Sequence, residues 1–112
     1  MCGYVCVCVC QALLQTGKTS PALMLANSHE YLNFTGHIVI AWQWLEMATA
    51  AGKKMLHPHQ EGEGDFSDNF LRGKRMTAQY FFRHELPKTV GQAALLVSLD
   101  DTNLAMKDEY FC

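Results

Sequence analysis

A long stretch of nearly uncharged sequence limits the folds that this chain can adopt. Between Pro21 and Gly52 the only formal charges are two glutamates. Ser20 followed by Pro21 is a typical helix start and Gly52 a natural stop, so the stretch predicts one long helix over residues 21–51. A helix that is apolar on most of its sides must be buried, which makes this helix the expected centre of the fold.

Three stripes of side chains at helical spacing run along this predicted helix. Small residues allow close helix packing, and we therefore expect Gly36 to lie at a helix crossing, where Gly36→Leu would destabilise more than Gly17→Leu. The stripes consist of Met24, Ser28, Tyr31, Thr35, Ile38, Trp42, Leu45 and Thr49, of Leu25, Leu32, Gly36 and Val39, and of Ile40, Trp44 and Met47.

The remaining chain predicts two further helices and one ambiguous segment. Val and Cys alternate up to Cys10, which favours a strand, while the following Gln-Ala-Leu-Leu-Gln favours a helix. A helix is expected from about residue 65 to 85, capped by Asp65 or Ser67 and ended by Pro87, and another over residues 88–99. The inner stripe of the former is predicted to be Phe66, Phe70, Gly73, Thr77 and Phe81.

Length and composition restrict the protein class. With 112 residues the chain predicts a single domain over residues 1–112, too short for a flavin or dinucleotide domain with a substrate domain. Hydrophobic residues make up 49% and charged residues 18%, and the net charge of −2 does not suggest nucleic-acid binding. The apolar stretch over residues 38–51 is shorter than the roughly 20 residues of a membrane helix.

The amino-terminal residues indicate the cellular location. A signal peptide requires a basic residue before its apolar run, and no such residue precedes the first apolar run here. Five cysteines, four of them within the first ten residues, do not form a disulfide framework, so we expect a reduced cytoplasmic protein.

Several short sequence motifs, distributed over most of the chain, are similar to those of one known family. They are Ala26-Asn-Ser-His-Glu-Tyr-Leu32, Phe34-Thr-Gly-His-Ile-Val-Ile-Ala-Trp-Gln-Trp-Leu45, Phe70-Leu-Arg-Gly-Lys74, Tyr80-Phe-Phe-Arg-His-Glu-Leu-Pro87 and Asp100-Asp-Thr102. Over roughly residues 9–111 they resemble the extra C-terminal domain of acyl-CoA dehydrogenases, in the branch that includes 3-methylmercaptopropionyl-CoA dehydrogenase. These are packing residues, so the resemblance indicates a fold more than an activity.

The resemblance implies an all-α bundle of about four helices in up-down order, with a long apolar central helix and a helix over residues 5–15. It also implies that flavin, thioester and catalytic base belong to domains upstream of this one. We therefore expect no cofactor and no enzyme activity. Residues 1–10 depart from the family pattern, and their Val-Cys alternation is what a TG dinucleotide repeat encodes, which suggests an orphan gene fragment or a mobile-cassette product.

Several polar and aromatic groups are candidate sites, and each also has a simpler structural role. His57 and His59 with Glu61, Glu63 and Asp65 resemble metal ligands, but a solvated linker is favoured. Thiolate binding of a metal by Cys6, Cys8 and Cys10 is disfavoured, because structural zinc ligands usually come as separated pairs. Three further candidates are a phosphate site at Arg72, Lys74, Arg75 and Arg83, a general-base pair of His37 and Glu30, and an acyl pocket lined by Trp42, Trp44, Tyr80, Phe81 and Phe82.

The leading functional hypothesis is a non-catalytic domain that acts through self-association. The segments outside the long helix can cover only part of its apolar surface, and acyl-CoA dehydrogenases of this resemblance are themselves oligomers, so a homodimer is predicted. The alternative is an accessory domain that binds a full acyl-CoA dehydrogenase or an acyl or other hydrophobic ligand. The expected interface residues are Ile40, Trp42 and Trp44, or Phe66, Phe70 and Phe82.

Overall fold

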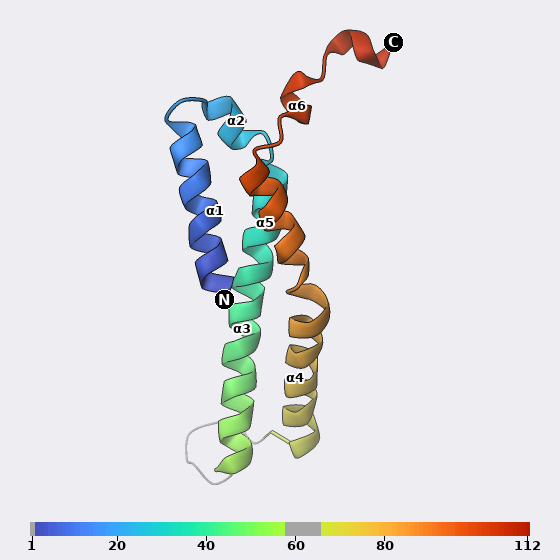
Figure 1. The fold of residues 1–112 in the computed structure, drawn as a ribbon. Helices are drawn as coiled ribbons and strands as arrows, with labels where there is room; N and C mark the ends of the chain where they lie inside the picture. Colours follow the sequence, from blue (N-terminus) through green and yellow to red (C-terminus); the bar gives the residue numbers. More distant parts are fainter. Residues whose placement is uncertain (1, 58–65) are drawn as a thin grey trace. The chain divides into compact units, whose positions relative to one another are not determined.

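The computed structural model describes residues 2–57 and 66–112, in which every regular element is a helix. The all-α bundle predicted from the sequence is thereby confirmed, with no strand in these two described ranges. The elements, drawn in Figure 1, are α1 (Cys2–Gly17), α2 (Pro21–Leu25), α3 (Ser28–Leu56), α4 (Asp68–Tyr80), the π-helical turn η1 (Phe81–Glu85), α5 (Lys88–Ser98), α6 (Thr102–Ala105) and the 3-10 turn η2 (Asp108–Phe111).

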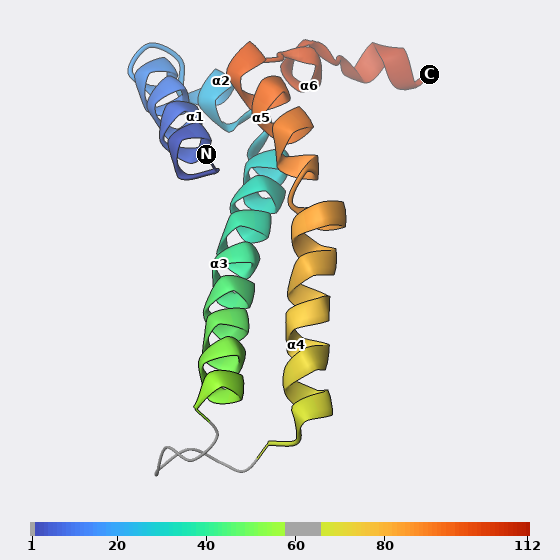
Figure 2. The ribbon, with the colours of Figure 1, turned by 60° about the horizontal axis from the view of Figure 1, so that its bottom comes forward.

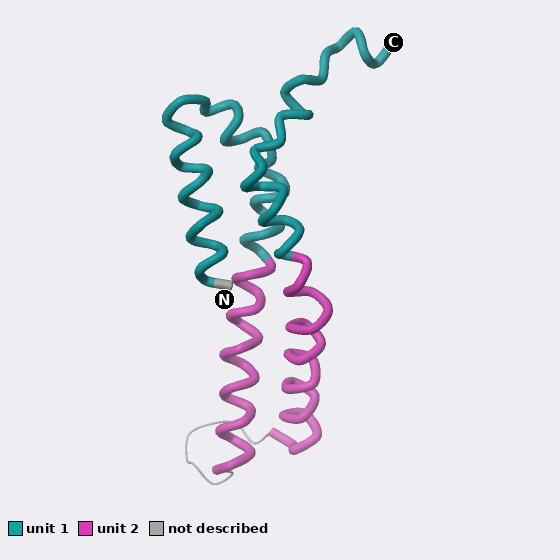
Figure 3. The backbone as a smooth tube through the Cα atoms, viewed as in Figure 1, with its two compact units in different colours: residues 1–36, 89–112 teal, residues 37–88 magenta. Residues whose placement is uncertain are grey.

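The chain divides into two compact units, coloured separately in Figure 3. Unit 1 comprises Met1–Gly36 and Thr89–Cys112, and unit 2 comprises His37–Lys88. Unit 1 thus contains α1, α2, the start of α3 and nearly all of α5. Unit 2 contains the rest of α3 with α4 and η1.

The buried side chains of unit 1 come from three helices. Val9 of α1, Phe34 of α3 and Leu96 of α5 are almost completely shielded from solvent, and Thr89 and Ala93 of α5 are also buried. Val9 lies in a regular helix although the Val-Cys segment has a local preference for a strand. Its burial in the core of unit 1 overrides that preference. The helix that the family resemblance implied for residues 5–15 is therefore confirmed.

Unit 2 is a helical hairpin in which α3 and α4 run side by side, as Figures 1 and 2 both show. Ser67 begins α4 as predicted, because its hydroxyl oxygen accepts a hydrogen bond from the Phe70 amide at 3.3 Å. At the other end, the Leu86 amide donates to the Phe81 carbonyl at 2.9 Å, the spacing of a π-helix. Pro87 has no amide hydrogen to continue the helix, so α5 starts afresh at Lys88.

The structure differs in two places from the single helix predicted over residues 21–51, near its start and at its end. Ser20 and Pro21 start a helix as expected, but α2 ends at Leu25 and a turn separates it from α3. The turn is held by hydrogen bonds from elsewhere in unit 1. Asn27 donates to the Asp100 carbonyl at 2.8 Å, and Asn103 donates to the Ala26 carbonyl at 3.1 Å.

The other end of α3 lies beyond the predicted stop. The helix continues through Gly52 to Leu56. Two lysines, Lys53 and Lys54, occupy its last turn. Their charges interact favourably with the negative end of the helix dipole, which explains why Gly52 does not end it.

Two packing predictions are also corrected. A Cβ atom built on Gly36 meets nothing within 4 Å, so Gly36 does not lie at a tight helix crossing, whereas one built on Gly17 collides with the Met24 sulfur. The inner stripe of α4 also differs from the predicted one. Leu71 and Ala78 are buried, while Phe66, Phe70, Gly73 and Thr77 are exposed.

Candidate functional site

The interior of unit 2 is built mainly from small side chains. Among the residues that the structure describes, its buried ones are Ala41 and Ala51 of α3 and Leu71 and Ala78 of α4. Alanine lets two helix backbones approach closely but contributes little apolar area to a core. Several large apolar side chains of unit 2, among them Trp42, Leu45 and Phe70, are exposed.

One side of α3 in unit 2 carries a row of exposed apolar residues. Trp42 is 60% exposed and Leu45 is 56% exposed, and with Thr49 they follow each other at steps of three and four residues. Val39, one turn before Trp42, is also exposed. We call Val39, Trp42 and Leu45 the Trp42 face.

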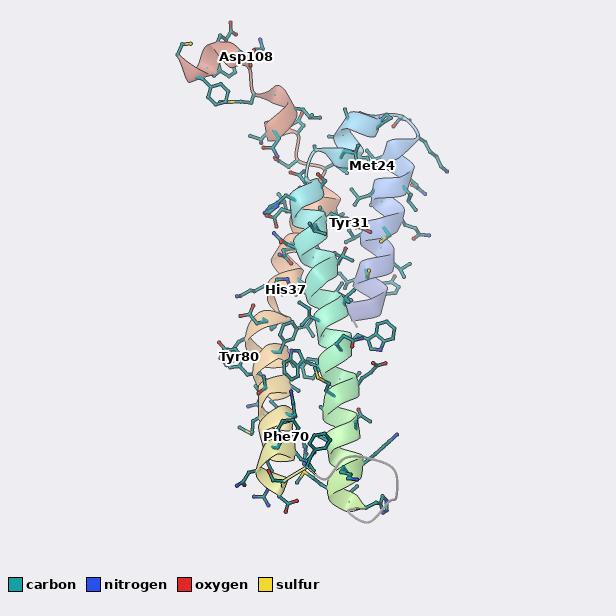
Figure 4. All side chains as sticks on the ribbon, turned by 180° about the vertical axis from the view of Figure 1, so that it is seen from behind. Met24, Tyr31, His37, Phe70, Tyr80 and Asp108 are labelled. Atoms are coloured by element: carbon teal, nitrogen blue, oxygen red, sulfur yellow. The ribbon has the colours of Figure 1, made fainter. Side chains whose placement is uncertain are left out.

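A recess lies between the C-terminal half of α3 and the first turns of α4. Its volume is about 370 Å³. Phe70 points from α4 towards α3 in Figure 4, and its ring stacks on that of Phe66 with centroids 5.0 Å apart. We call this cavity the Phe70 recess, and it is lined by Met47, Ala50, Ala51, Lys54, Phe66, Phe70, Leu71 and Lys74.

Lys74 lies at the aromatic wall of the Phe70 recess. Its ammonium nitrogen is 5.3 Å from the centroid of Phe70 and 5.8 Å from that of Trp44, which are cation–π distances. None of the ion pairs seen among residues 2–57 and 66–112 involves Lys74. A half-buried positive charge is thus held beside an apolar cavity.

Neither of the two sets predicted as interface residues, Ile40, Trp42 and Trp44 or Phe66, Phe70 and Phe82, is exposed throughout. Ile40 and Trp42 are exposed on α3, whereas Trp44 and Phe82 are half-buried. Phe82 lines a separate hollow with Ala48, Thr49, Arg75, Ala78 and Gln79. Phe66 and Phe70 belong to the Phe70 recess.

The aromatic residues that could have formed an acyl pocket are likewise divided among different surfaces. Trp42 and Tyr80 are exposed, and the Tyr80 ring stacks on His84 with centroids 4.5 Å apart.

Sequence reasoning missed the role of Lys74 in the Phe70 recess. The four-residue spacing of Phe70 and Lys74 could have revealed it, since residues at that spacing meet on a helix surface.

His37 has an acidic neighbour other than Glu30, the partner that the sequence suggests. Its Nε2 lies 3.6 Å from Oε2 of Glu85, and Nζ of Lys88 lies 2.9 Å from the same oxygen. The hydrogen bond from Lys88 is the main cause that lowers the pKa of Glu85, and His37 adds to it. This cluster joins α3 to the end of η1 within unit 2, so a structural role explains it.

Cys6, Cys8 and Cys10 of α1 are free thiols rather than parts of a disulfide. Sγ of Cys10 lies 3.5 Å from the Tyr31 hydroxyl, and both side chains line an apolar hollow of about 280 Å³ in unit 1. Burial raises the pKa of the Cys6 thiol, with Cys10 as a further cause. The contact with Cys10 is also the first cause that raises the pKa of Tyr31.

The remaining charged candidates do not gather into one site. Arg72, Arg75 and Arg83 are exposed, and Lys74 faces the Phe70 recess instead of joining them. No group of three or more His, Cys, Asp or Glu side chains among the described residues is placed to hold a metal ion. The candidate metal ligands His59, Glu61, Glu63 and Asp65 lie outside the described residues.

A comparison with models of known protein families identifies the family of this chain. The chain matches the family model described as acetyl-CoA dehydrogenase C-terminal like over residues 7–107. It therefore belongs to this family of helical domains. Comparison with curated proteins and with solved structures gave no match. In the parts of the chain that the structure describes, no helix has the length and apolar character needed to cross a membrane.

Proposed function

We propose that this domain is non-catalytic and acts by associating with a second copy of itself. The observation that carries the proposal is the reversed distribution of side-chain size in unit 2. Three of the four buried residues in its described part are alanines, while tryptophan, leucine and phenylalanine side chains are exposed. Large apolar side chains are the ones that gain most from burial, so their position favours a partner outside the hairpin.

The Trp42 face is the best candidate for the contact. It presents Trp42 and Leu45 on one side of α3, and the side chain of Glu46 beside them is the only acidic group between His37 and Gly52. Tryptophan is enriched among residues that dominate interface energies. A twofold dimer would use the same patch on both copies and pack two hairpins as a four-helix bundle.

Family membership supports a role in association. The matched family takes its description from the C-terminal part of dehydrogenases, and the acyl-CoA dehydrogenases that the sequence resembles are oligomers. The His37–Glu85–Lys88 cluster joins two elements of unit 2, so these titratable groups have a structural explanation without catalysis. A flavin band in the visible spectrum of the purified protein would contradict the non-catalytic proposal.

Size exclusion with light scattering at micromolar concentration tests self-association. We expect twice the 12.6 kDa mass of the chain. Trp42→Glu places a charge in the contact and should shift the protein to monomer. Met76→Glu is the matched control, because Met76 is 65% exposed and belongs to α4, whereas the Trp42 face belongs to α3.

The Met76→Glu variant should remain a dimer. A wild-type protein that elutes as a monomer would refute the proposal. Equal dissociation of both variants would show that the Trp42 face is not the contact. Circular dichroism of both variants checks that the helices are retained.

A further inference from the structure

The Phe70 recess combines an apolar cavity with positive charge. Of the eight lining residues that the structure describes, six are apolar and two are lysines, and none is acidic. The volume of about 370 Å³ falls within the range of small-molecule sites. An occupant that suits this wall has an apolar body and an anionic end.

The lysine in the recess is held in place before any ligand binds. Lys74 is half-buried, and its ammonium group lies over the Phe70 and Trp44 rings at 5.3 and 5.8 Å. Contact with the rings limits the conformations of the long side chain, so less entropy is lost when it binds an anion. A carboxylate at this point would gain a charge-assisted hydrogen bond from Nζ.

The opposite wall provides room for a hydrocarbon chain. Ala50 and Ala51 are small, and with Met47 they leave the α3 side of the recess open to the stacked Phe66–Phe70 pair. Methionine adapts its shape to irregular apolar ligands.

From this arrangement we infer that the Phe70 recess binds the free carboxylate of a medium-chain fatty acid, with the carboxylate at Lys74 and the alkyl chain against Met47, Ala50 and the Phe66–Phe70 pair. None of the described residues that line the recess belongs to the Trp42 face, so this inference goes beyond self-association. A neutral alcohol of equal length lacks the charge for Lys74. A short carboxylate lacks the apolar chain.

Isothermal titration calorimetry with the full chain tests the site. Decanoate, kept below the concentration at which it forms micelles, should bind with one site per chain. Decanol and acetate should bind roughly tenfold or more weakly, the size expected from loss of a charge-assisted contact or of the buried chain. Equal affinity for decanoate and decanol would show an unspecific apolar surface and overturn the inference.

Variants locate the binding within the recess. Lys74→Gln should weaken decanoate roughly tenfold and leave decanol unchanged, because only the carboxylate contact is lost. Arg75→Gln is the matched control, since it removes one positive charge from the exposed side of the same helix. Ala50→Phe fills the recess from an exposed position and should weaken both ligands.

The outcome also separates this inference from dimer formation. Trp42→Glu should bind decanoate as the wild type does, whatever its oligomeric state. Loss of decanoate binding in this variant would assign the recess to a subunit contact and overturn the inference. Unchanged binding by Lys74→Gln and Ala50→Phe would place decanoate elsewhere and overturn it as well.

Discussion

Two glycines show how the surroundings of a residue decide the effect of a methyl group. Gly36 lies in the interior of α3, and a Cβ there would meet no atom within 4 Å. Gly17 ends α1, and a Cβ there would press on the Met24 sulfur. Glycine in a helix interior is less favourable than alanine by up to about 1 kcal/mol, and at Gly36 no packing contact opposes that preference.

Gly36→Ala is therefore expected to stabilise the protein by up to about 1 kcal/mol. Gly17→Ala should gain less or lose stability, because Met24 must move to admit the methyl group. Urea denaturation of both variants at one protein concentration measures the difference. A lower midpoint for Gly36→Ala than for the wild type would show that Gly36 is closely packed after all.

The turn between α2 and α3 depends on hydrogen bonds from a distant element. Asn27 donates to the Asp100 carbonyl at 2.8 Å, and Asn103 donates to the Ala26 carbonyl at 3.1 Å and to the Asn27 side-chain oxygen at 3.4 Å. These bonds connect the turn to the segment after α5 within unit 1. They satisfy polar groups where the helix is interrupted.

Asn27→Ala should lower the stability by about 1 kcal/mol, because it removes the donor to Asp100 and the acceptor for Asn103. Thermal denaturation followed by circular dichroism measures the loss. Asn69→Ala in α4 is the control, since Asn69 is exposed and alanine favours a helix. Equal melting temperatures for Asn27→Ala and the wild type would mean that the turn is held by packing alone.

Sequence signals locate some helix ends of this chain and miss others. Ser67 and Pro87 act through local chemistry, as a cap and as a missing amide donor, and both predictions are confirmed. The break at Asn27 escapes sequence reasoning because its partner Asp100 is far along the chain. The buried side of α4 is also predicted incorrectly. The prediction assumes that the largest apolar side chains of a helix face inward.

The structure shows why that expectation fails. Leu71 and Ala78 pack inward, while Phe66 and Phe70 surround the recess. No pattern of hydrophobicity distinguishes an aromatic residue in a core from one in a recess or at a contact with another chain. The same ambiguity explains why the sequence predicts two alternative sets of interface residues.

At the scale of the whole molecule, the question is how the folded chain covers its apolar residues. Unit 1 buries Phe34, Leu96 and Val9 almost completely. In unit 2, Trp42 and Leu45 remain more than half exposed. A partner that binds only the folded chain stabilises it by mass action, so stability should depend on protein concentration.

A homodimer makes a quantitative prediction about that dependence. If folding and association are coupled, tenfold dilution lowers the apparent stability by about 1.4 kcal/mol, which is the free energy of a tenfold change in concentration. Because the two chains of a dimer unfold together, the melting temperature should then fall by about 3 °C for each tenfold dilution. Scanning calorimetry over a hundredfold concentration range provides the measurement. Trp42→Glu should melt at a temperature independent of concentration, because its Trp42 face no longer pairs, while Met76→Glu should follow the wild type. A wild-type melting temperature that stays constant over this range would mean that the exposed residues of unit 2 gain nothing from a second copy.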